Sequence, residues 1–331
     1  MKLAAIPLIL STALCPLSGQ IYQSRPEYCG RPADANPPLP DISAAFDGNG
    51  EAVLHVGAAG PARGISLHGA GSLPSILHRI DEVCPLDDGR LVVFGGLGAT
   101  EILIVDPAKG TVVDDFFVWR PVISPDQRWI VYEKMYPAHG APDPSSEDLM
   151  YDLSKSAAQN RPGGDLANTS DVGAVIFPPG QKNLPFDNLR LPADQRHSLQ
   201  SRFFWASDSR AIVFEDELAS QPNKIILVTL DEKGTPTALE HEITATDLCG
   251  NSPPDVKTLW RRLDRAEVGS DRNGTRMMVL DLSSDDARCP THIIQLSTSD
   301  FQPSRTEMHV RQEPTHGTVL NGQPATPPKK K

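Results

Sequence analysis

The amino-acid sequence predicts an all-β protein made of repeated four-stranded units, the architecture of a β-propeller. Three observations lead to this prediction. Proline makes up 31 of the 331 residues, and proline is poorly tolerated in helix interiors. Turns rich in Asp, Asn, Gly and Pro recur along the chain, and each precedes an apolar run of strand length. Several of these turns return after about 40 residues, the length of one propeller blade.

Five turns carry the repeat, and the strands after them begin at residues 51, 90, 128, 210 and 276. The intervals are 39, 38, 82 and 66 residues, so two are close to the blade length and one is about twice as long. Four units contain a second expected strand, at residues 101–106, 149–152, 224–231 and 292–296. Two such strands form the hairpin expected within a blade. A β-sandwich, the alternative, gives no reason for the same turn to return at this interval.

Residues 135–200 interrupt the repeat, since they contain eight prolines and no clean copy of the turn. A structureless loop of this length is unusual in a compact domain, so we expect one degenerate blade here, with residues 172–177 as a strand. Five visible units and this inferred one give six blades. Seven are expected if residues 20–45 or the C-terminal tail contribute a further strand.

One short helix is expected as an insertion before the last unit. Ser252 is a good N-cap and is followed by two prolines. The apolar residues that follow have helical spacing: Val256, Leu259, Trp260 and Leu263. The expected organisation is therefore a Pro-rich lead-in at 20–42, a propeller domain at 43–311 and a disordered tail at 312–331.

Residues 1–19 have the pattern of a cleaved signal peptide, with an apolar run from Leu3 to Leu14 and the small residue Gly19 at the expected cleavage position. Twelve apolar residues are too few to span a membrane, which takes about 20. A lipoprotein signal would use Cys15, but the bulky neighbour Leu14 argues against it. We therefore expect an exported protein, secreted or periplasmic, without a membrane span.

Four cysteines remain after the signal peptide, an even number in an exported chain. We predict the disulfides Cys29–Cys84 and Cys249–Cys289, because each pair flanks one unit, the first and the last. Four cysteines allow three pairings, so the connectivity stays open, as do four free thiols. None of the four has a C-x-x-C or C-x-x-H partner, so the spacing does not support a zinc site.

Two copies of the turn, Ile123–Tyr132 and Phe204–Phe214, resemble the W-S-P-D-G-K/R-x-I-A-F motif of the TolB-like, WD-like β-propeller repeat family. The match is weaker at 86–94 and 269–280 and weakest at 46–56. The glycine of the motif is replaced by Gln127 in one copy and Ser209 in the other. The resemblance implies a propeller over most of 43–311. It implies no catalytic residues, because in that family the repeated motif builds the blades.

An Asp and an Arg recur in the blade turns, as the pairs Asp88 and Arg90, Asp126 and Arg128, Asp208 and Arg210, and Asp271 and Arg276. A residue that recurs from unit to unit serves what the units share. We therefore expect each Arg to pack over its strand and to bind turn carbonyls or the neighbouring Asp, a scaffold role. Function is expected where one unit departs from the others, at 135–200 and 247–265.

No sequence motif points to catalysis, a cofactor or a metal. A G-x-S-x-G elbow is missing, and Gly95–Gly98 lacks the following glycine and helix of a phosphate loop. The nine histidines share no metal-binding spacing. The acidic runs at 215–217 and 285–286 are expected to lie in solvated loops. We therefore expect no cofactor and no metal.

The formal net charge of −11 argues against partners that need concentrated positive charge, such as nucleic acids and anionic membranes. The leading hypothesis is an exported, non-catalytic propeller that binds or scaffolds another protein or envelope component. Two alternatives stay open. One is a secreted hydrolase or lyase with its site at the mouth of the propeller channel, and the other is a carbohydrate or cell-wall binder. The aromatic content of 6% makes the second weaker. The oligomeric state stays open.

Overall fold

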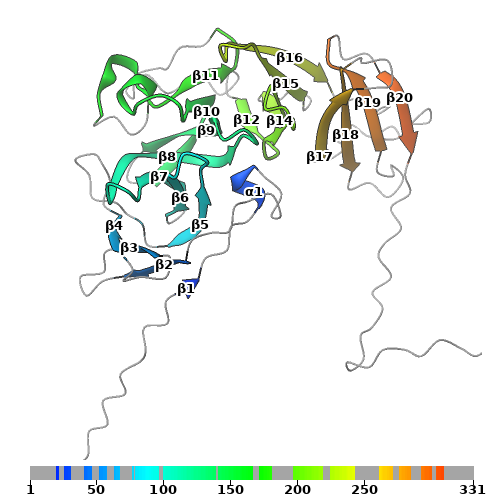
Figure 1. Cartoon of the computed structure of the whole chain (residues 1–331). Helices are drawn as coiled ribbons and strands as arrows, with labels where there is room; N and C mark the ends of the chain where they lie inside the picture. The colour runs from blue at the N-terminus through cyan, green and yellow to red at the C-terminus, as the bar shows by residue number, and fades with distance from the viewer. Residues whose placement is uncertain are drawn as a thin grey trace, which may run out of the picture.

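The computed structural model describes residues 20–21, 26–30, 41–46, 52–57, 63–67, 77, 79–96, 100–138, 141–166, 171–180, 197–218, 224–242, 261–270, 276–284, 292–299 and 303–308. These residues form four antiparallel sheets that follow one another in chain order (Figure 1). The repeated turns and apolar runs of the sequence therefore produce an almost entirely β structure.

The first sheet contains β1 (Gln20–Ile21), β2 (Asp41–Phe46), β3 (Ala52–Gly57) and β4 (Arg63–Ser66). The second contains β5 (Ile80–Pro85), β6 (Leu91–Gly95), β7 (Thr100–Asp106), β8 (Thr111–Ile123), β9 (Trp129–Ala138), β10 (Ala141–Asp152) and β11 (Ala174–Phe177). The third contains β12 (His197–Leu199), β13 (Phe204–Trp205), β14 (Ala211–Leu218), β15 (Lys224–Leu230) and β16 (Pro236–Glu242). The fourth contains β17 (Arg261–Ser270), β18 (Arg276–Ser284), β19 (His292–Ser297) and β20 (Pro303–Met308).

The seven-stranded sheet consists of two four-stranded units that share β8. The first part of β8 pairs with β7, and its end pairs with β9. The register shifts between Trp119 and Val122, where Arg120 has a left-handed φ of 48° and Pro121 follows. The strand thus changes partners at this bend. The described residues form five units: β1–β4, β5 to the first part of β8, the end of β8 to β11, β12–β16, and β17–β20.

Four hydrophobic cores lie between consecutive units, so the sheets stack face to face. Apolar residues alternate in direction along each strand: in β14, Val213 faces the fifth unit, while Ile212 and Phe214 face the third. The four cores include, from the first joint to the last, Leu54 and Leu103, Phe116 and Tyr151, Phe177 and Phe214, and Leu227 and Leu280. Stacked four-stranded antiparallel units are the blade arrangement of a propeller. Within the described part of the chain, no core cluster joins the fifth unit to the first.

The five strands predicted after the turns are confirmed as β3, β6, β9, β14 and β18. The turns before β6, β9 and β14 are described, and those before β3 and β18 lie outside the described residues. The separate blade expected at 135–200 is wrong for the described part of that region. There, β10 and β11 complete the third unit and β12 begins the fourth. Residues 137–138 and 141–147 extend the two strands of the β9–β10 hairpin. The apolar end of β11 is buried directly against the fourth unit, where the centroids of the Phe177 and Phe214 rings lie 5.6 Å apart. Among the described residues, no further sheet lies between these two units.

The predicted helix after Ser252 lies largely outside the described residues. Its last expected residue, Leu263, is in β17 and packs in the core between the fourth and fifth units. A strand therefore occupies that end of the predicted helix. The predicted signal peptide at 1–19, the predicted tail at 312–331 and the predicted disulfide between Cys249 and Cys289 also lie outside the described residues. No helix among the described residues has the length and apolar character needed to cross a membrane.

The predicted disulfide between Cys29 and Cys84 is present, with the two Cα atoms 5.4 Å apart. Cys29 ends the four-residue helix α1 (Pro26–Cys29), which contacts β5 and β8. Tyr28 stacks on Phe94, with ring centroids 5.2 Å apart, and both half-cystines are buried in the core between the second and third units. The bridge therefore fastens part of the Pro-rich lead-in to this core.

Candidate functional site

The blade turns share one hydrogen bond. In the three described Asp-x-Arg turns, a carboxylate oxygen of the Asp accepts the backbone N–H of the Arg. The donor–acceptor distances are 3.0 Å for Asp88 and Arg90, 3.1 Å for Asp126 and Arg128, and 2.9 Å for Asp208 and Arg210. This Asx-type bond accounts for the repeated Asp. Asp271 of the fourth pair lies outside the described residues.

The position between Asp and Arg has a left-handed backbone in each of the three turns. Gly89 has a φ of 85°, while Gln127 and Ser209 both have a φ of 58°. Both non-glycine side chains contact a neighbouring unit. Gln127 donates to the carbonyl of Pro85 at 2.9 Å, and the Ser209 hydroxyl accepts the N–H of Asp126 at 2.9 Å. The two departures from the family motif therefore lie where side chains join adjacent units.

The four arginines of these turns have different partners. Arg90 donates to the Leu153 carbonyl of the third unit at 2.7 Å. Arg276 donates to Asp208 of the fourth unit at 3.0 Å. The Arg128 guanidinium lies 4.2 Å from the centroid of the Trp129 ring and 3.8 Å from Asp152. For Arg210 the described bonds are those of its backbone: its N–H is donated to Asp208, and its carbonyl accepts the N–H of Leu230 at 2.9 Å. Arg90 and Arg276 thus each connect two units.

A pocket of about 300 Å³ lies beside these turns, at the joint between the third and fourth units. Its lining comes from three places in the chain. The third unit contributes Trp129, Met150, Asp152, Gly173 and Ala174; the segment after β10 contributes Lys155, Gln159, Asn160, Arg161 and Pro162; and the β15–β16 turn contributes Lys233 and Gly234. Most of this lining falls within 135–200, the region where the sequence departs from the repeat.

One wall of the pocket is the segment 153–166, here called the pocket segment, which contains two short 3-10 turns at 158–160 and 162–164. The Asn160 side chain accepts the N–H of Asp152 and donates to its carbonyl, both at 2.9 Å. The Arg161 guanidinium forms two bonds to Asp114, whose carboxylate also accepts the hydroxyl of Tyr151 at 2.6 Å. These buried contacts hold the pocket segment against β8 and β10.

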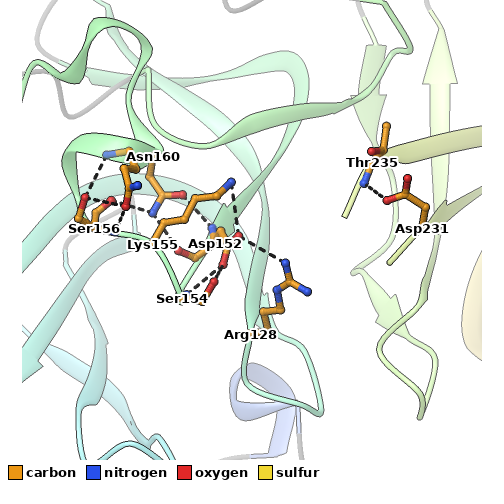
Figure 2. Close-up of polar contacts among 9 residues, drawn as sticks. Arg128, Asp152, Ser154, Lys155, Ser156, Asn160, Asp231 and Thr235 are labelled. Carbon is orange, nitrogen blue, oxygen red and sulfur yellow. Dashed lines mark hydrogen bonds and ion pairs between the residues drawn. The ribbon is translucent and has the colours of Figure 1, made fainter. Parts of the chain in front are cut away.

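The buried carboxylate of Asp152 lies between two cations, as Figure 2 shows. One oxygen accepts the backbone N–H and the hydroxyl of Ser154, at 2.9 and 2.5 Å. The other has no hydrogen bond and lies 3.4 Å from Lys155 and 3.8 Å from Arg128. Lys155 is half exposed. Asp152 therefore neutralises part of the positive charge at the pocket while holding Lys155 beside it.

The opposite wall is the β15–β16 turn. Asp231 accepts the N–H of Lys233 at 2.8 Å. It also accepts the N–H of Thr235 at 2.7 Å, as Figure 2 shows, and the two bonds close the turn. Gly234 has a φ of 82° and lies so close to the Trp129 ring that an added Cβ would be 2.5 Å from a ring carbon. The turn of the fourth unit thus packs on the tryptophan of the third, and Lys233 lies at the pocket.

A second group of ionisable residues is buried at the same joint, on the strands. Burial raises the pKa of Glu133 to about 7, and the nearby Arg120 opposes the shift. Burial also raises the pKa values of Asp148 and Asp216, and the carboxylate of Glu133 adds to the shift at Asp148. Nδ1 of His197 lies 2.7 Å from an Asp216 oxygen. Shifted groups can mark a functional site, but ion-pair networks that hold a structure together have them too.

The buried carboxylates have structural partners across the joints. Glu133 accepts the N–H of Leu199, and Glu215 accepts the N–H of Leu263 at 2.9 Å. The sequence contains a signal for this, since Glu133 and Glu215 each follow the turn arginine by five residues, and Asp281 follows Arg276 by the same spacing. The expectation that 215–217 is a solvated loop is wrong for Glu215 and Asp216, which are buried in β14. The charges in the sequence could not indicate this burial, because residues of a neighbouring unit, distant in the sequence, shield these carboxylates from solvent.

The raised carboxyl pKa values predict a pH-dependent stability. A carboxyl group with a higher pKa in the folded than in the unfolded chain favours folding while protonated. Its contribution is complete below an unfolded pKa of about 4 and is lost as the pH rises through the folded value. With Glu133 near 7, we expect the free energy of unfolding to fall by on the order of 2 kcal/mol between pH 5 and pH 8.

Urea unfolding at several pH values measures this dependence. Glu133→Gln is the matched variant, because the amide oxygen can still accept the Leu199 N–H but cannot ionise. The variant should show a flatter pH profile, with the main gain in stability at pH 8. An unchanged slope in the variant would contradict the assignment.

One group of possible metal ligands occurs among the described residues, formed by Cys29, Glu82 and Cys84, whose ligand atoms lie within 4.8 Å of one another. The two sulfurs form the disulfide, and a metal requires the thiolate form. With the disulfide formed, the two cysteines therefore serve as a covalent link between α1 and β5.

Comparisons with known proteins found distant structural likenesses. No protein-family profile matches the chain, and no curated protein sequence matches it. Solved structures with a similar arrangement include a prolyl endopeptidase (TM-score 0.42, 10% identity), which matches 82% of this chain and 35% of its own. TolB from Acinetobacter baumannii has a TM-score of 0.30 and 14% identity, and the match covers 81% of this chain and 52% of TolB. The Dos1 propeller has a TM-score of 0.32 and 11% identity, and the match covers 81% of this chain and 55% of Dos1. The chain therefore spans from about a third to about half of the length of these proteins.

Proposed function

We propose that this chain is an exported, non-catalytic protein of propeller type that acts as a protein-binding or scaffolding module. The observation that carries the proposal is the pocket between the third and fourth units. Its walls are the pocket segment and the β15–β16 turn, and its lining holds cations and hydrogen-bond donors around Trp129 and Met150. Such a surface can bind a partner through charge, hydrogen bonds and apolar contact.

The position of the pocket supports this role. The four-stranded units bury their apolar residues against each other, so the joints supply stability. The pocket segment lies outside the four-stranded pattern, and the hydrogen bonds of Asn160 to Asp152 and of Arg161 to Asp114 attach it to the strands. Binding residues are often carried on irregular segments that a rigid scaffold positions. The export part of the proposal is supported by the Cys29–Cys84 disulfide, because disulfides persist in oxidising compartments.

A cross-linking experiment in the exporting cell tests this function. The chain is expressed in its host with an affinity tag, cross-linked, and purified for quantitative mass spectrometry. We expect at least one protein to be enriched with the unmodified chain and to be reduced about tenfold with Lys155→Glu plus Lys233→Glu, because the reversed charges repel a partner that binds these cations.

Lys109→Glu provides the matched control. Lys109 lies in the β7–β8 turn of the second unit, which corresponds to the turn that carries Lys233, and it is exposed beside Asp106. The control should capture the same partner as the unmodified chain. Equal capture by all three proteins would show that the pocket is not the binding surface, and the absence of any specific protein would contradict the binding function.

A further inference from the structure

The charge at the pocket is opposite in sign to that of the whole chain. The protein carries a net charge of −11, yet the pocket is lined by two lysines and one arginine against a single carboxylate, that of Asp152. Arg161 is neutralised by Asp114 and lies below the surface. Lys155 shares Asp152 with Arg128. The charge of Lys233 acts on the carboxylate of Asp231 in the same turn. The excess of positive charge at the pocket therefore comes from Arg128 and Lys155, which share the single carboxylate of Asp152.

The two lysines lie on opposite walls of the joint. Lys155 belongs to the pocket segment of the third unit, and Lys233 belongs to the turn of the fourth. A ligand that contacts both must bridge the two units. Arg161 is the only guanidinium in the described lining, and Asp114 occupies both of its terminal nitrogens. The pocket therefore offers separate ammonium groups and no free fork for bidentate binding of a single carboxylate or phosphate.

The pocket also has an apolar side. Trp129 and Met150 are largely buried, and both line the cavity. The Trp129 ring is fixed between the Arg128 guanidinium and Gly234. The parts of Trp129 and Met150 that line the cavity form a small, rigid apolar surface beside the lysines, which fits an apolar side chain flanked by acidic ones.

From these observations we infer that the pocket binds an acidic peptide segment of a partner protein, with Asp or Glu side chains at Lys155 and Lys233 and an apolar side chain against Trp129. This inference rests on the protein-binding function proposed above. Because the lysines lie on different units, the bound segment crosses the joint between the third and fourth units.

Selection from a library of random dodecapeptides displayed on phage tests the inference. The baits are the full chain, the double variant Lys155→Gln plus Lys233→Gln, and Lys109→Gln as the matched control. Peptides selected by the full chain should be enriched in Asp and Glu next to Leu, Phe or Trp. Synthetic versions should bind the control equally and the double variant about tenfold more weakly, since two exposed ion pairs are worth roughly 1.4 kcal/mol together.

The outcomes separate this inference from the function on which it rests. Selected peptides without an acidic excess, or acidic peptides that bind the double variant equally, would overturn the acidic-segment site and leave a protein-binding module. Selection of no peptide by any bait would count against the protein-binding function and the site together. Each peptide is also made with a C-terminal amide and with a free acid. Equal affinities support side-chain carboxylates, and binding of the free acid alone would overturn that assignment.

Discussion

Replacing Arg161 with alanine is expected to lower the free energy of unfolding by about 3–5 kcal/mol. The Arg161 side chain is almost fully buried and binds Asp114, whose carboxylate is also buried and accepts the hydroxyl of Tyr151. Without the guanidinium, Asp114 remains in the core between the second and third units as a carboxylate with no cation. An uncompensated buried charge is costly, whereas an exposed ion pair contributes little.

Chemical denaturation followed by circular dichroism measures this loss. The double variant Arg161→Met plus Asp114→Asn is the control, because it removes both charges and keeps an acceptor for Tyr151. It should recover a substantial part of the stability lost in Arg161→Ala. A loss below about 1 kcal/mol in Arg161→Ala would contradict the buried ion pair. Limited proteolysis should also cut the pocket segment faster in this variant, because Arg161 holds that segment against β8.

Gly234→Ala is expected to destabilise the protein by about 2–4 kcal/mol, from two separate causes. Gly234 has a φ of 82°, which is unfavourable for residues with a Cβ. The new methyl group would also lie 2.5 and 2.7 Å from two atoms of the Trp129 ring. The ring is only 5% exposed and cannot move aside without disturbing the joint between the third and fourth units.

Gly89→Ala separates the two causes. Gly89 has a φ of 85°, similar to that of Gly234, and an added Cβ would meet nothing within 4 Å. It should cost about 1 kcal/mol from the backbone alone. The difference between the two variants in thermal and urea unfolding then reports the contact with Trp129. Equal losses would mean that the turn and the tryptophan are not in close contact.

The strands were predictable because their signals are local. The turn at Leu86–Gly89 and the apolar run after it lie within ten residues, and a strand must begin where such a turn ends. The sharing of β8 between two units was not predictable, because its change of pairing partner from β7 to β9 depends on tertiary packing and not on the local sequence. The burial of Glu215 and Asp216 was missed for the same reason, since a third consecutive acid, Glu217, gives the sequence a solvated appearance.

The pocket could be predicted only by region. Its position within 135–200 follows from the interruption of the repeat, but its composition depends on contacts between distant residues. Arg161 meets Asp114 across 47 positions of the sequence, and Lys155 and Lys233 lie on different units. Glu133 and Glu215 form a recoverable signal, because they repeat at the same distance from the turn arginine. A pattern of this kind indicates that the acidic residues occupy equivalent positions in their units. Which backbone N–H each carboxylate accepts depends on the neighbouring unit.

The crossing of β8 between two units has a consequence for how the molecule can come apart. The second and third units share the backbone hydrogen bonds of one strand, so neither can lose its order while the other keeps its own. The joint between the third and fourth units has no shared strand among the described residues, and packed side chains and single hydrogen bonds hold it. Under mechanical load, the joint between the third and fourth units should therefore open before the second and third units separate, and the pocket that spans it would be lost while those two units stay together.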